Sequence, residues 1–314
     1  MRCVIDKYIP FINGRLEGLF DVVQYLEPES INHDNIRNAD VLLIRTRTRC
    51  NRELLEGTKV GLIATATIGI DHIDLDYCRK AGIRVCNAPG CNARGVAQYV
   101  ESALSYLNFS RGTIGIVGVG HVGRLVQQMA ERHGFRALLY DPPRQRTEGG
   151  SQWTTDISEL AREADVITFH TPLTRKGTDA TFHLADDAFL SCCKKDVLII
   201  NAARGGVVDE SALLKQNVRC VIDTWENEPH INQELLHHAL IATPHIAGYS
   251  AEGKRNATRM ILEQLSDFIG RTIDLTGLQT GSQPLPVYDI MQDDGRLRNE
   301  PQAFERIRQK YVFR

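Results

Sequence analysis

The stretch TIGIVGVGHVG, residues 113–123, carries the strongest structural signal in the chain. Its apolar first half is typical of a buried strand and leads directly into Gly118-x-Gly120-x-x-Gly123, after which RLVQQMAERHG has a helical pattern. This glycine motif is specific only between a strand and a helix, with an acidic residue about 20 positions further on. Asp141 lies 18 residues after Gly123. The context therefore predicts the turn of a dinucleotide-binding fold rather than an incidental glycine turn.

Each residue of this turn has a physical task. Gly118 allows the tight turn, Gly120 lets the backbone approach a pyrophosphate, and Gly123 lets the helix pack closely on the strand. The N–H groups at the start of the helix, from about His121 and Val122, face the phosphate charge. The turn is therefore predicted to bind the pyrophosphate of a dinucleotide.

Asp141 follows the next predicted strand, where a carboxylate accepts hydrogen bonds from the adenosine ribose diol. The same carboxylate repels a 2′-phosphate, so NAD is the predicted cofactor. Arg144 and Arg146 lie close enough in sequence to keep NADP open as an alternative.

Short apolar runs alternate with helical patterns throughout the chain, which is typical of parallel sheets covered by helices. The predicted strands are residues 3–6, 22–26, 41–46, 61–67 and 83–89, and then 113–118, 135–141, 164–170, 196–202, 219–223 and 239–244. The second group has six members, the number in a complete dinucleotide-binding fold. The predicted fold class is α/β, with two doubly wound parallel-sheet domains: a flavodoxin-like substrate domain and a Rossmann NAD domain.

Two helical patterns indicate how these domains are connected. Residues 92–107 are expected to cross into the second domain, and the amphipathic stretch 250–270, which no further strand follows, is expected to pack back on the first. The predicted domains are a discontinuous substrate domain, an NAD-binding domain and a short C-terminal appendage: residues 1–92 with 248–280, residues 93–247, and residues 281–314.

The composition excludes several classes of partner. The chain has 37 Lys and Arg residues against 39 Asp and Glu, so nothing favours nucleic acid or a membrane surface. Its apolar runs are too short to span a bilayer. The eight cysteines contain no C-x-x-C pair, and the N-terminus has no apolar signal-peptide core. A cytoplasmic location with reduced thiols is expected.

Three predicted strands of the second domain end in polar loops, at residues 201–206, 223–229 and 243–248. The carboxyl ends of parallel strands meet at one crevice, so Arg204, an acid and His245 are expected to converge. A guanidinium can hold a substrate carboxylate, a histidine can take a hydroxyl proton, and an acid can orient the imidazole. This set suits oxidation of a 2-hydroxy acid, although spacing alone does not choose between Glu226 and Glu228.

The motifs TATIGIDHID, GIVGVGHVGR, INAARGGVVD, DTWENEP and TPHIAGYSAEGK occur in the order found in the D-2-hydroxyacid dehydrogenase family, which this chain resembles. The resemblance implies that Arg204 binds the substrate carboxylate, Glu228 partners the histidine and His245 is the acid/base. It also implies that backbone amides of residues 67–71 contact the substrate carboxylate.

Within that family, the sequence looks like a branch that oxidises a phosphorylated sugar acid in vitamin B6 biosynthesis. The resemblance implies substrate contacts at Thr46, Thr67 and Tyr249. It implies NAD contacts at Asp141, Thr171, Ala202, Asp223 and Gly248. Residues 281–314 resemble a shortened part of that branch's dimerisation domain, so a homodimer is expected.

A substrate phosphate needs cationic donors, and RTRTRC at residues 45–50 offers them. By strand alternation, Arg45, Arg47 and Arg49 share one face. Arg45 or Arg47 is therefore predicted to bind the phosphate, with Lys254 and Arg255 as competing candidates. No metal site is expected, since DHID (71–74) has the spacing of a structural turn.

Two alternatives remain open at this point. A related dehydrogenase acting on 3-phosphoglycerate or another 2-hydroxy acid would share the same catalytic residues. A non-enzymatic, NAD-sensing corepressor of the same family would also retain them.

Overall fold

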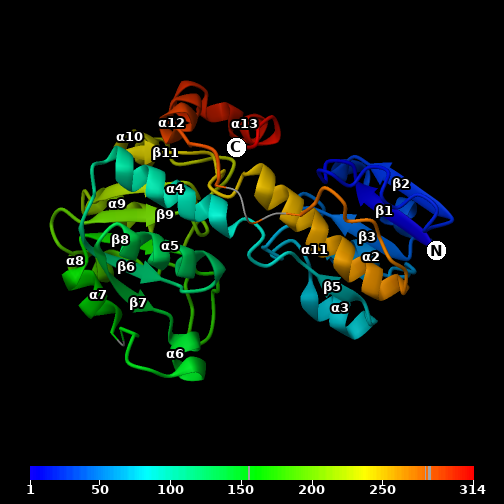
Figure 1. Ribbon diagram of the computed structural model, residues 1–314, viewed down its shortest axis with the longest axis horizontal. Helices are drawn as coiled ribbons and strands as arrows, with labels where there is room; N and C mark the ends of the chain where they lie inside the picture. Colours follow the sequence, from blue (N-terminus) through cyan, green and yellow to red (C-terminus); the bar gives the residue numbers. More distant parts are fainter. Residues whose placement is uncertain (155, 280, 282–283) are drawn as a thin grey trace. The chain divides into compact units, whose positions relative to one another are not determined.

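The computed structural model describes residues 1–154, 156–279, 281 and 284–314 (Figure 1). These residues form two compact units. Unit 1 comprises Met1–Asn92 and Ser250–Pro284, and unit 2 comprises Ala93–Tyr249 and Leu285–Arg314. The domain boundaries proposed from the sequence stay a prediction, and the one at residue 280 lies outside the described residues.

Unit 1 is built on a five-stranded parallel sheet in the order β2-β1-β3-β4-β5. Its strands are β1 (Arg2–Asp6), β2 (Val22–Leu26), β3 (Val41–Ile44), β4 (Leu62–Thr65) and β5 (Arg84–Cys86). Every residue of β3 and β4 is buried, as expected for central strands covered on both faces. The order 2-1-3-4-5 is that of flavodoxin-like folds, so this part of the predicted fold is confirmed.

Among the described residues, four short helices and one long helix pack around this sheet. They are η1 (Pro28–Ser30), α1 (His33–Ile36), α2 (Arg52–Leu55), α3 (Leu75–Ala81) and α11 (Ala251–Ile269). Helix α11 begins where Ser250 accepts a hydrogen bond from the Gly253 N–H at 3.0 Å, and it ends at Gly270, whose φ is 65°. Its apolar face, including Ile261 and Leu265, shares one buried cluster with β1, β3 and β4.

Unit 2 contains six parallel strands in the order β11-β10-β9-β8-β6-β7. They are β6 (Gly112–Val117), β7 (Phe135–Tyr140), β8 (Val166–Phe169), β9 (Leu198–Asn201), β10 (Arg219–Ile222) and β11 (Ile241–Ala242). All six were predicted. In chain order the sheet is 2-1-3-4-5-6, whereas the common dinucleotide-binding order is 3-2-1-4-5-6. Beside β7, the described residues form an isolated bridge between Leu139 and Trp153, which follows two glycines with positive φ, Gly149 and Gly150.

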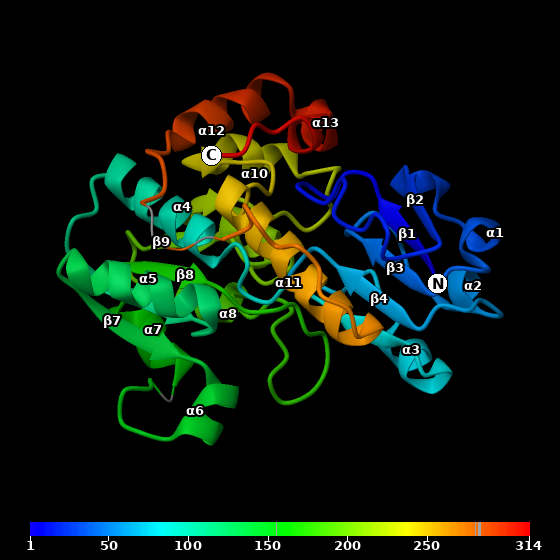
Figure 2. The same cartoon turned by 45° about the vertical axis from the view of Figure 1, so that its right-hand side comes forward.

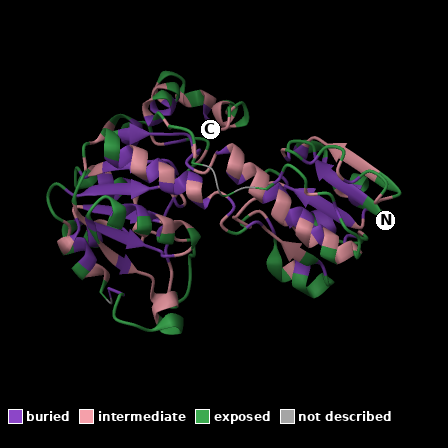
Figure 3. Ribbon diagram, viewed as in Figure 1, coloured by how far each residue is buried: buried purple, intermediate pink, exposed green. Residues whose placement is uncertain are grey.

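Helices cover both faces of this sheet, and its strands are largely buried, as the purple ribbon in Figure 3 shows. One apolar cluster packs α4 (Ala93–Tyr106) and α5 (His121–Arg132) on one face. A second cluster fills the opposite face with α7, α8, α9 and α10 (Ile157–Glu163, Asp187–Ser191, Glu210–Lys215 and Gln233–His238). Helix α6 (Pro142–Glu148) buries no side chain fully and follows β7 directly.

The C-terminal segment of unit 2 contains α12 (Ile290–Asn299), η2 (Pro301–Ala303) and α13 (Phe304–Gln309). Helix α12, labelled in Figures 1 and 2, packs against β11 at the edge of the sheet (β11 is labelled in Figure 1). There the buried Asp294 accepts a hydrogen bond from the Ala242 N–H at 2.7 Å. Leu297 and Phe304 are fully buried in the core of the unit. This segment therefore completes an edge of the NAD-domain sheet. Within the described residues, no helix has the length and apolar character needed to cross a membrane.

Candidate active site

The three polar loops predicted from the sequence follow β9, β10 and β11, which are neighbours in the sheet. Asn201 links the first two loops, because its amide donates to the carbonyl oxygens of Arg204 at 3.1 Å and Thr224 at 3.4 Å. A Cβ on Gly205 would lie 1.7 Å from the Trp225 carbonyl oxygen, so only glycine permits this approach. The sheet thus places Arg204, the acidic loop and His245 at one edge.

His245 and Glu228 form a hydrogen-bonded pair. Nδ1 of His245 lies 2.8 Å from Oε2 and 3.0 Å from Oε1 of Glu228, and it donates its proton to this carboxylate. Oε1 also accepts a hydrogen bond from the Trp225 N–H at 2.9 Å. Because Nδ1 is engaged, Nε2 is the ring atom left to exchange a proton with a substrate.

The Glu228 carboxylate is held in its charged form. Burial by itself raises the pKa of Glu228, but His245, the Trp225 N–H and Arg308 together outweigh it and bring the pKa below its ordinary value. A charged carboxylate behind the ring fixes the tautomer and stabilises an imidazolium when one forms. The pair therefore has the geometry of an acid/base centre.

Glu226, the other acid that spacing could not exclude, has different partners. Its carboxylate lies 3.0 Å from Nε2 of His183 and accepts a hydrogen bond from the Glu210 N–H at 3.2 Å. His183, Asp209 and Glu226 each bring one potential metal-ligand atom to within 4.8 Å of the others. Glu226 thus belongs to a separate polar cluster, and Glu228 is the acid that contacts His245.

Asp223 organises the loop that carries His245. Its fully buried carboxylate accepts hydrogen bonds from the Thr243 hydroxyl at 2.6 Å and from the N–H groups of Ile246 at 2.8 Å and Ala247 at 3.0 Å. The loop also places His245 at φ 56°, a conformation that needs such support in a non-glycine residue. The resemblance implied an NAD contact for Asp223, and the structure adds this positioning function.

Two further groups that hold this loop were not foreseen from the sequence. The buried Tyr99 hydroxyl lies 2.8 Å from the Thr243 hydroxyl, and the Trp225 indole N–H donates to the Thr243 carbonyl oxygen at 3.0 Å. Both contacts join positions far apart in the chain, so no local pattern could have revealed them.

The C-terminal segment also contacts this loop. The Arg314 guanidinium donates hydrogen bonds to the carbonyl oxygens of Ile246 at 3.1 Å and Ala247. The Tyr249 ring makes edge contacts with Tyr311 and Phe313, with centroid distances of 5.7 and 6.2 Å. Residues 246–249 are therefore supported from the C-terminal segment, and the substrate contact expected for Tyr249 stays a prediction.

The glycine turn has the shape that NAD requires. A Cβ on Gly123 would lie 2.1 Å from the Gly118 carbonyl oxygen, whereas a Cβ on Gly120 would meet no atom within 4 Å. Packing thus explains Gly123, and the open space at Gly120 suits the approach of a phosphate. The Thr171 methyl group borders the Gly118 position, and the Thr171 hydroxyl is buried without a hydrogen-bond partner in the described residues. These features fit a bound dinucleotide.

Asp141 lies at the end of β7 and holds the glycine turn in place. One carboxylate oxygen accepts from the Val119 N–H at 2.8 Å, and the other caps α6 by accepting from the Arg144 N–H at 3.1 Å. The Arg144 guanidinium approaches to 3.8 Å. The Asp141 carboxylate therefore connects the glycine turn with the start of α6. Its charge lies where the ribose of the cofactor is expected.

We expect Asp141→Asn to weaken NAD binding about tenfold, since hydrogen bonds to a charged group contribute about 1.5–3 kcal/mol. Its discrimination against NADP should fall as well, because the repelling charge is removed. Fluorescence titration with NADH and NADPH measures both effects. Asp156→Asn is the matched control, because Asp156 also caps a helix of unit 2 but is exposed. Equal NADH affinity in both variants would contradict the assignment.

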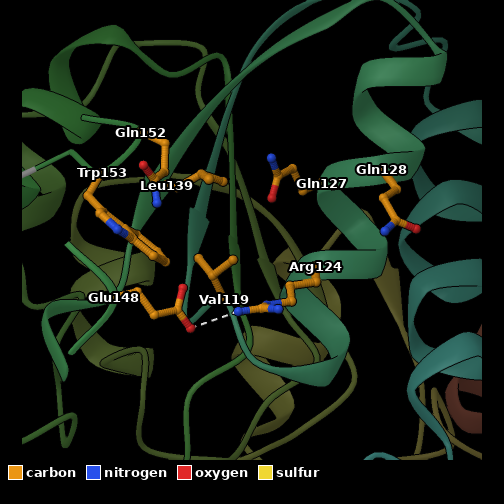
Figure 4. Close-up of a pocket in the computed structure, with 8 residues that line it drawn as sticks. All are labelled: Val119, Arg124, Gln127, Gln128, Leu139, Glu148, Gln152 and Trp153. Atoms are coloured by element: carbon orange, nitrogen blue, oxygen red, sulfur yellow. Dashed lines mark hydrogen bonds and ion pairs between the residues drawn. The ribbon is translucent and has the colours of Figure 1, made fainter. Parts of the chain in front are cut away.

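A cavity of about 250 Å³ lies on the α5 side of β7 (Figure 4). Arg124 of α5 and Glu148 of α6 point toward one another at its rim and form an ion pair of 2.8 Å. Its other lining residues are Val119, Gln127, Gln128, Leu139, Gln152 and Trp153. None of the predicted site residues lines this cavity.

In unit 1, the predicted substrate-binding threonines follow the neighbouring strands β3 and β4. The Thr67 hydroxyl donates to the Gly69 carbonyl oxygen at 3.0 Å and lies 2.7 Å from the Thr65 hydroxyl. Thr46 follows β3 in a turn. Both threonines thus lie at the carboxyl edge of the unit 1 sheet, where ligands bind in open α/β folds.

The arginines of residues 45–50 do not alternate along a strand, so the prediction that they share one strand face is wrong. Strand β3 ends at Ile44, and the following residues form a turn, so period-two alternation does not apply to them. Arg45 donates to the Tyr8 carbonyl oxygen at 2.8 Å, and Arg47 forms an ion pair with Glu29. Both charges act on the buried Asp6, although burial raises the pKa of this carboxyl overall. Phosphate binding by Arg45 or Arg47 therefore stays a prediction that strand alternation no longer supports. Phosphate binding by Lys254 stays a prediction as well.

Comparison with known proteins identifies close relatives of this chain. Residues 92–247 match the family "D-isomer specific 2-hydroxyacid dehydrogenase, NAD binding domain". The chain is 44% identical to the erythronate-4-phosphate dehydrogenase of Bacteroides thetaiotaomicron, covering all of this chain and 97% of the relative. It is 40% identical to the enzyme of the same name from Cronobacter sakazakii, covering all of this chain and 92% of that protein.

Solved structures show the same fold. NAD-bound 3-phosphoglycerate dehydrogenase of Entamoeba histolytica has a TM-score of 0.72 at 25% identity, covering 90% of this chain and 99% of that one. D-lactate dehydrogenase of Aquifex aeolicus, complexed with NAD and lactic acid, has a TM-score of 0.66 at 25% identity, covering 85% and 96%.

Proposed function

The chain belongs to the family of D-isomer specific 2-hydroxyacid dehydrogenases and is an NAD-dependent enzyme, and from this premise we propose that it oxidises 4-phospho-D-erythronate to 2-oxo-3-hydroxy-4-phosphobutanoate. The observation that supports the reaction is the hydrogen-bonded pair of His245 and Glu228 beside the Arg204 loop. The choice of substrate rests on the name shared by relatives at 40–44% identity. A place in vitamin B6 biosynthesis, as a cytoplasmic homodimer, is part of the same proposal.

In this mechanism the Arg204 guanidinium binds the C1 carboxylate and polarises the oxygen on C2. Nε2 of His245 accepts the C2 hydroxyl proton as the C2–H bond breaks. The chemistry supplied by bound NAD is acceptance of the hydride from C2. Glu228 stabilises the imidazolium that results, and the products are a 2-oxo acid, NADH and protonated His245.

The cofactor is proposed to bind along the carboxyl edge of the unit 2 sheet. The N–H groups near His121 and Val122 face its pyrophosphate, and Asp141 receives the ribose diol. Further contacts are assigned to Thr171, Ala202, Asp223 and Gly248. The substrate is proposed to contact Thr46, Thr67 and Tyr249, together with the amides of residues 67–71.

A turnover assay tests the proposal. Purified protein receives NAD with 4-phosphoerythronate, 3-phosphoglycerate or lactate, and NADH formation is followed in the presence and absence of an added 2-oxo acid that reoxidises a tightly held cofactor. We expect kcat/KM for 4-phosphoerythronate to exceed that for lactate by about 10²-fold or more, since losing a buried charged partner costs about 2–5 kcal/mol. A preference for 3-phosphoglycerate, whose dehydrogenase has the same fold, would replace the substrate assignment but keep the reaction.

Single replacements of Arg45, Arg47 and Lys254 by glutamine locate the phosphate site. At least one of them should raise KM for 4-phosphoerythronate about tenfold or more, because a charge-assisted hydrogen bond contributes about 1.5–3 kcal/mol, while KM for lactate stays unchanged. Arg52→Gln is the control, since Arg52 is an exposed arginine of unit 1 paired with Glu56. Unchanged KM values in all three variants would exclude these residues from the phosphate site.

A further inference from the structure

Helix α13 places the guanidinium of Arg308 near the carboxylate of Glu228. Nη1 of Arg308 lies 4.0 Å from Oε2 of Glu228, and the two side chains are only 17% and 19% exposed. The helix is anchored by Phe304, which is fully buried, and the Arg308 guanidinium lies over the Phe304 ring at 5.7 Å. The packing of α13 therefore holds the Arg308 side chain near Glu228.

The hydrogen bonds of Arg308 do not account for its burial. Nη1 donates to Glu305 at 2.7 Å, but Glu305 is 42% exposed, and Nε of Arg308 is buried with no partner in the part of the chain that the structure describes. An unsatisfied buried donor costs about 1–3 kcal/mol. A contact serving stability alone would be expected to satisfy this nitrogen.

Arg308 changes the charge balance of the pair. With neutral His245, Arg308 and Glu228 form an ion pair of opposite charges. With protonated His245, two cations share one carboxylate, so Arg308 opposes protonation of the ring. Solvent and salt screen the interaction between Arg308 and Glu228 only weakly, because the Glu228 carboxylate is largely buried.

Other charged and titratable groups also face this centre. Asp223 interacts with His245 from the β10 loop, and Glu210 interacts with Glu228 from α9. Tyr249, which follows the His245 loop, interacts with Arg308. Asp223 favours the protonated ring, as Glu228 does. The cations described near the pair are Arg308 and, on the loop after β9, Arg204, whose charge is matched by the substrate carboxylate in the proposed mechanism.

We propose that Arg308 is a positioning residue that acts through Glu228 to keep His245 neutral, and so able to accept the substrate proton, at lower pH than the histidine–glutamate pair alone would allow. This inference rests on the proposed function of His245. It assigns a task in the reaction to the C-terminal segment, which lies outside all the motifs that carry the family resemblance.

The pH profile of Arg308→Gln tests the proposal. Oxidation requires neutral His245, so activity rises with pH through the pKa of this histidine. Without Arg308 the imidazolium is stabilised, and the acidic limb of kcat/KM for oxidation should move up by about one pH unit. Oxidation below that limb then falls by about tenfold, while the plateau at high pH is unchanged. In the direction of 2-oxo acid reduction, which requires the imidazolium, the basic limb should move up by the same amount.

Two variants serve as controls. Arg308→Lys keeps the positive charge and should retain the wild-type limb. Arg306→Gln removes an exposed arginine of the same helix, paired with Glu300, and should leave the whole profile unchanged. A lowered plateau with unmoved limbs in Arg308→Gln would overturn the proposal, because this is the result of a merely structural contact.

A second measurement makes the outcome independent of turnover. NMR titration of histidine-labelled protein, with the His245 signal assigned by its loss in His245→Gln, should show a higher pKa for His245 in Arg308→Gln than in the unmodified protein. Arg308→Met, whose side chain needs no polar partner, replaces the glutamine variant if that variant fails to fold. An unchanged His245 titration overturns the proposal. If His245→Gln instead keeps full activity, the assignment of the base fails while the coupling to Arg308 is still measured.

Discussion

His245→Gln should lower kcat for oxidation by about 10²–10⁴-fold, the usual contribution of a positioned general base. Glutamine keeps a polar side chain of similar reach but cannot accept and hold the hydroxyl proton. Since the proposed NAD contacts are made by the glycine turn, Asp141 and other residues and not by the His245 ring, NAD affinity should stay nearly unchanged. Steady-state kinetics together with NADH titration separates the two effects.

His237→Gln is a suitable control, because His237 is an exposed histidine on α10 of the same unit. The acidic limb of the pH profile should vanish in His245→Gln and persist in His237→Gln. Glu228→Gln should also lower kcat, because the neutral amide no longer stabilises the imidazolium. A kcat for His245→Gln within threefold of the unmodified enzyme would require another base.

Arg204→Lys should lower kcat/KM by about 30-fold to several thousand-fold, since disrupting a buried charge pair costs about 2–5 kcal/mol. Lysine keeps the charge but lacks the planar fork that binds a carboxylate through two hydrogen bonds. The loss should appear in KM, through the carboxylate contact, and in kcat, through weaker polarisation of the C2 oxygen.

The measurement is a full kinetic comparison with Arg136→Lys, which changes an exposed arginine of the same unit that is paired with Glu163. This control should behave as the unmodified enzyme does. Thermal unfolding of both variants checks that the loop after β9 is intact. If KM and kcat of Arg204→Lys are unchanged, the carboxylate must bind elsewhere.

The arginines of residues 45–50 show a limit of strand periodicity. The apolar run of β3 was recognised, but the strand ends at Ile44, two residues before the predicted end. A turn begins there, and its arginines are directed by contacts with Tyr8 and Glu29 rather than by strand alternation. Where a strand ends depends on such tertiary contacts. Beyond that end, the two-residue alternation of a strand no longer predicts the direction of a side chain.

The acid partner of His245 shows the same limit within the active site. Glu226 and Glu228 are two residues apart, and the spacing of residues alone could not separate them. In the folded chain Glu226 contacts His183, whereas Glu228 contacts His245. The choice depends on loops that follow three different strands and on a histidine more than 40 positions away.

By itself the sequence determined the parallel α/β class, the order of its strands along the chain, the glycine turn between β6 and α5, and the three polar loops. These features follow from local periodicity and from the glycines of one turn, which act over a few residues. Only the tertiary structure decided which acid contacts His245, how Asp223 and Tyr99 hold its loop, and that α13 brings Arg308 to within 4.0 Å of Glu228. Those contacts join segments distant in the chain, and packing of the whole unit selects them.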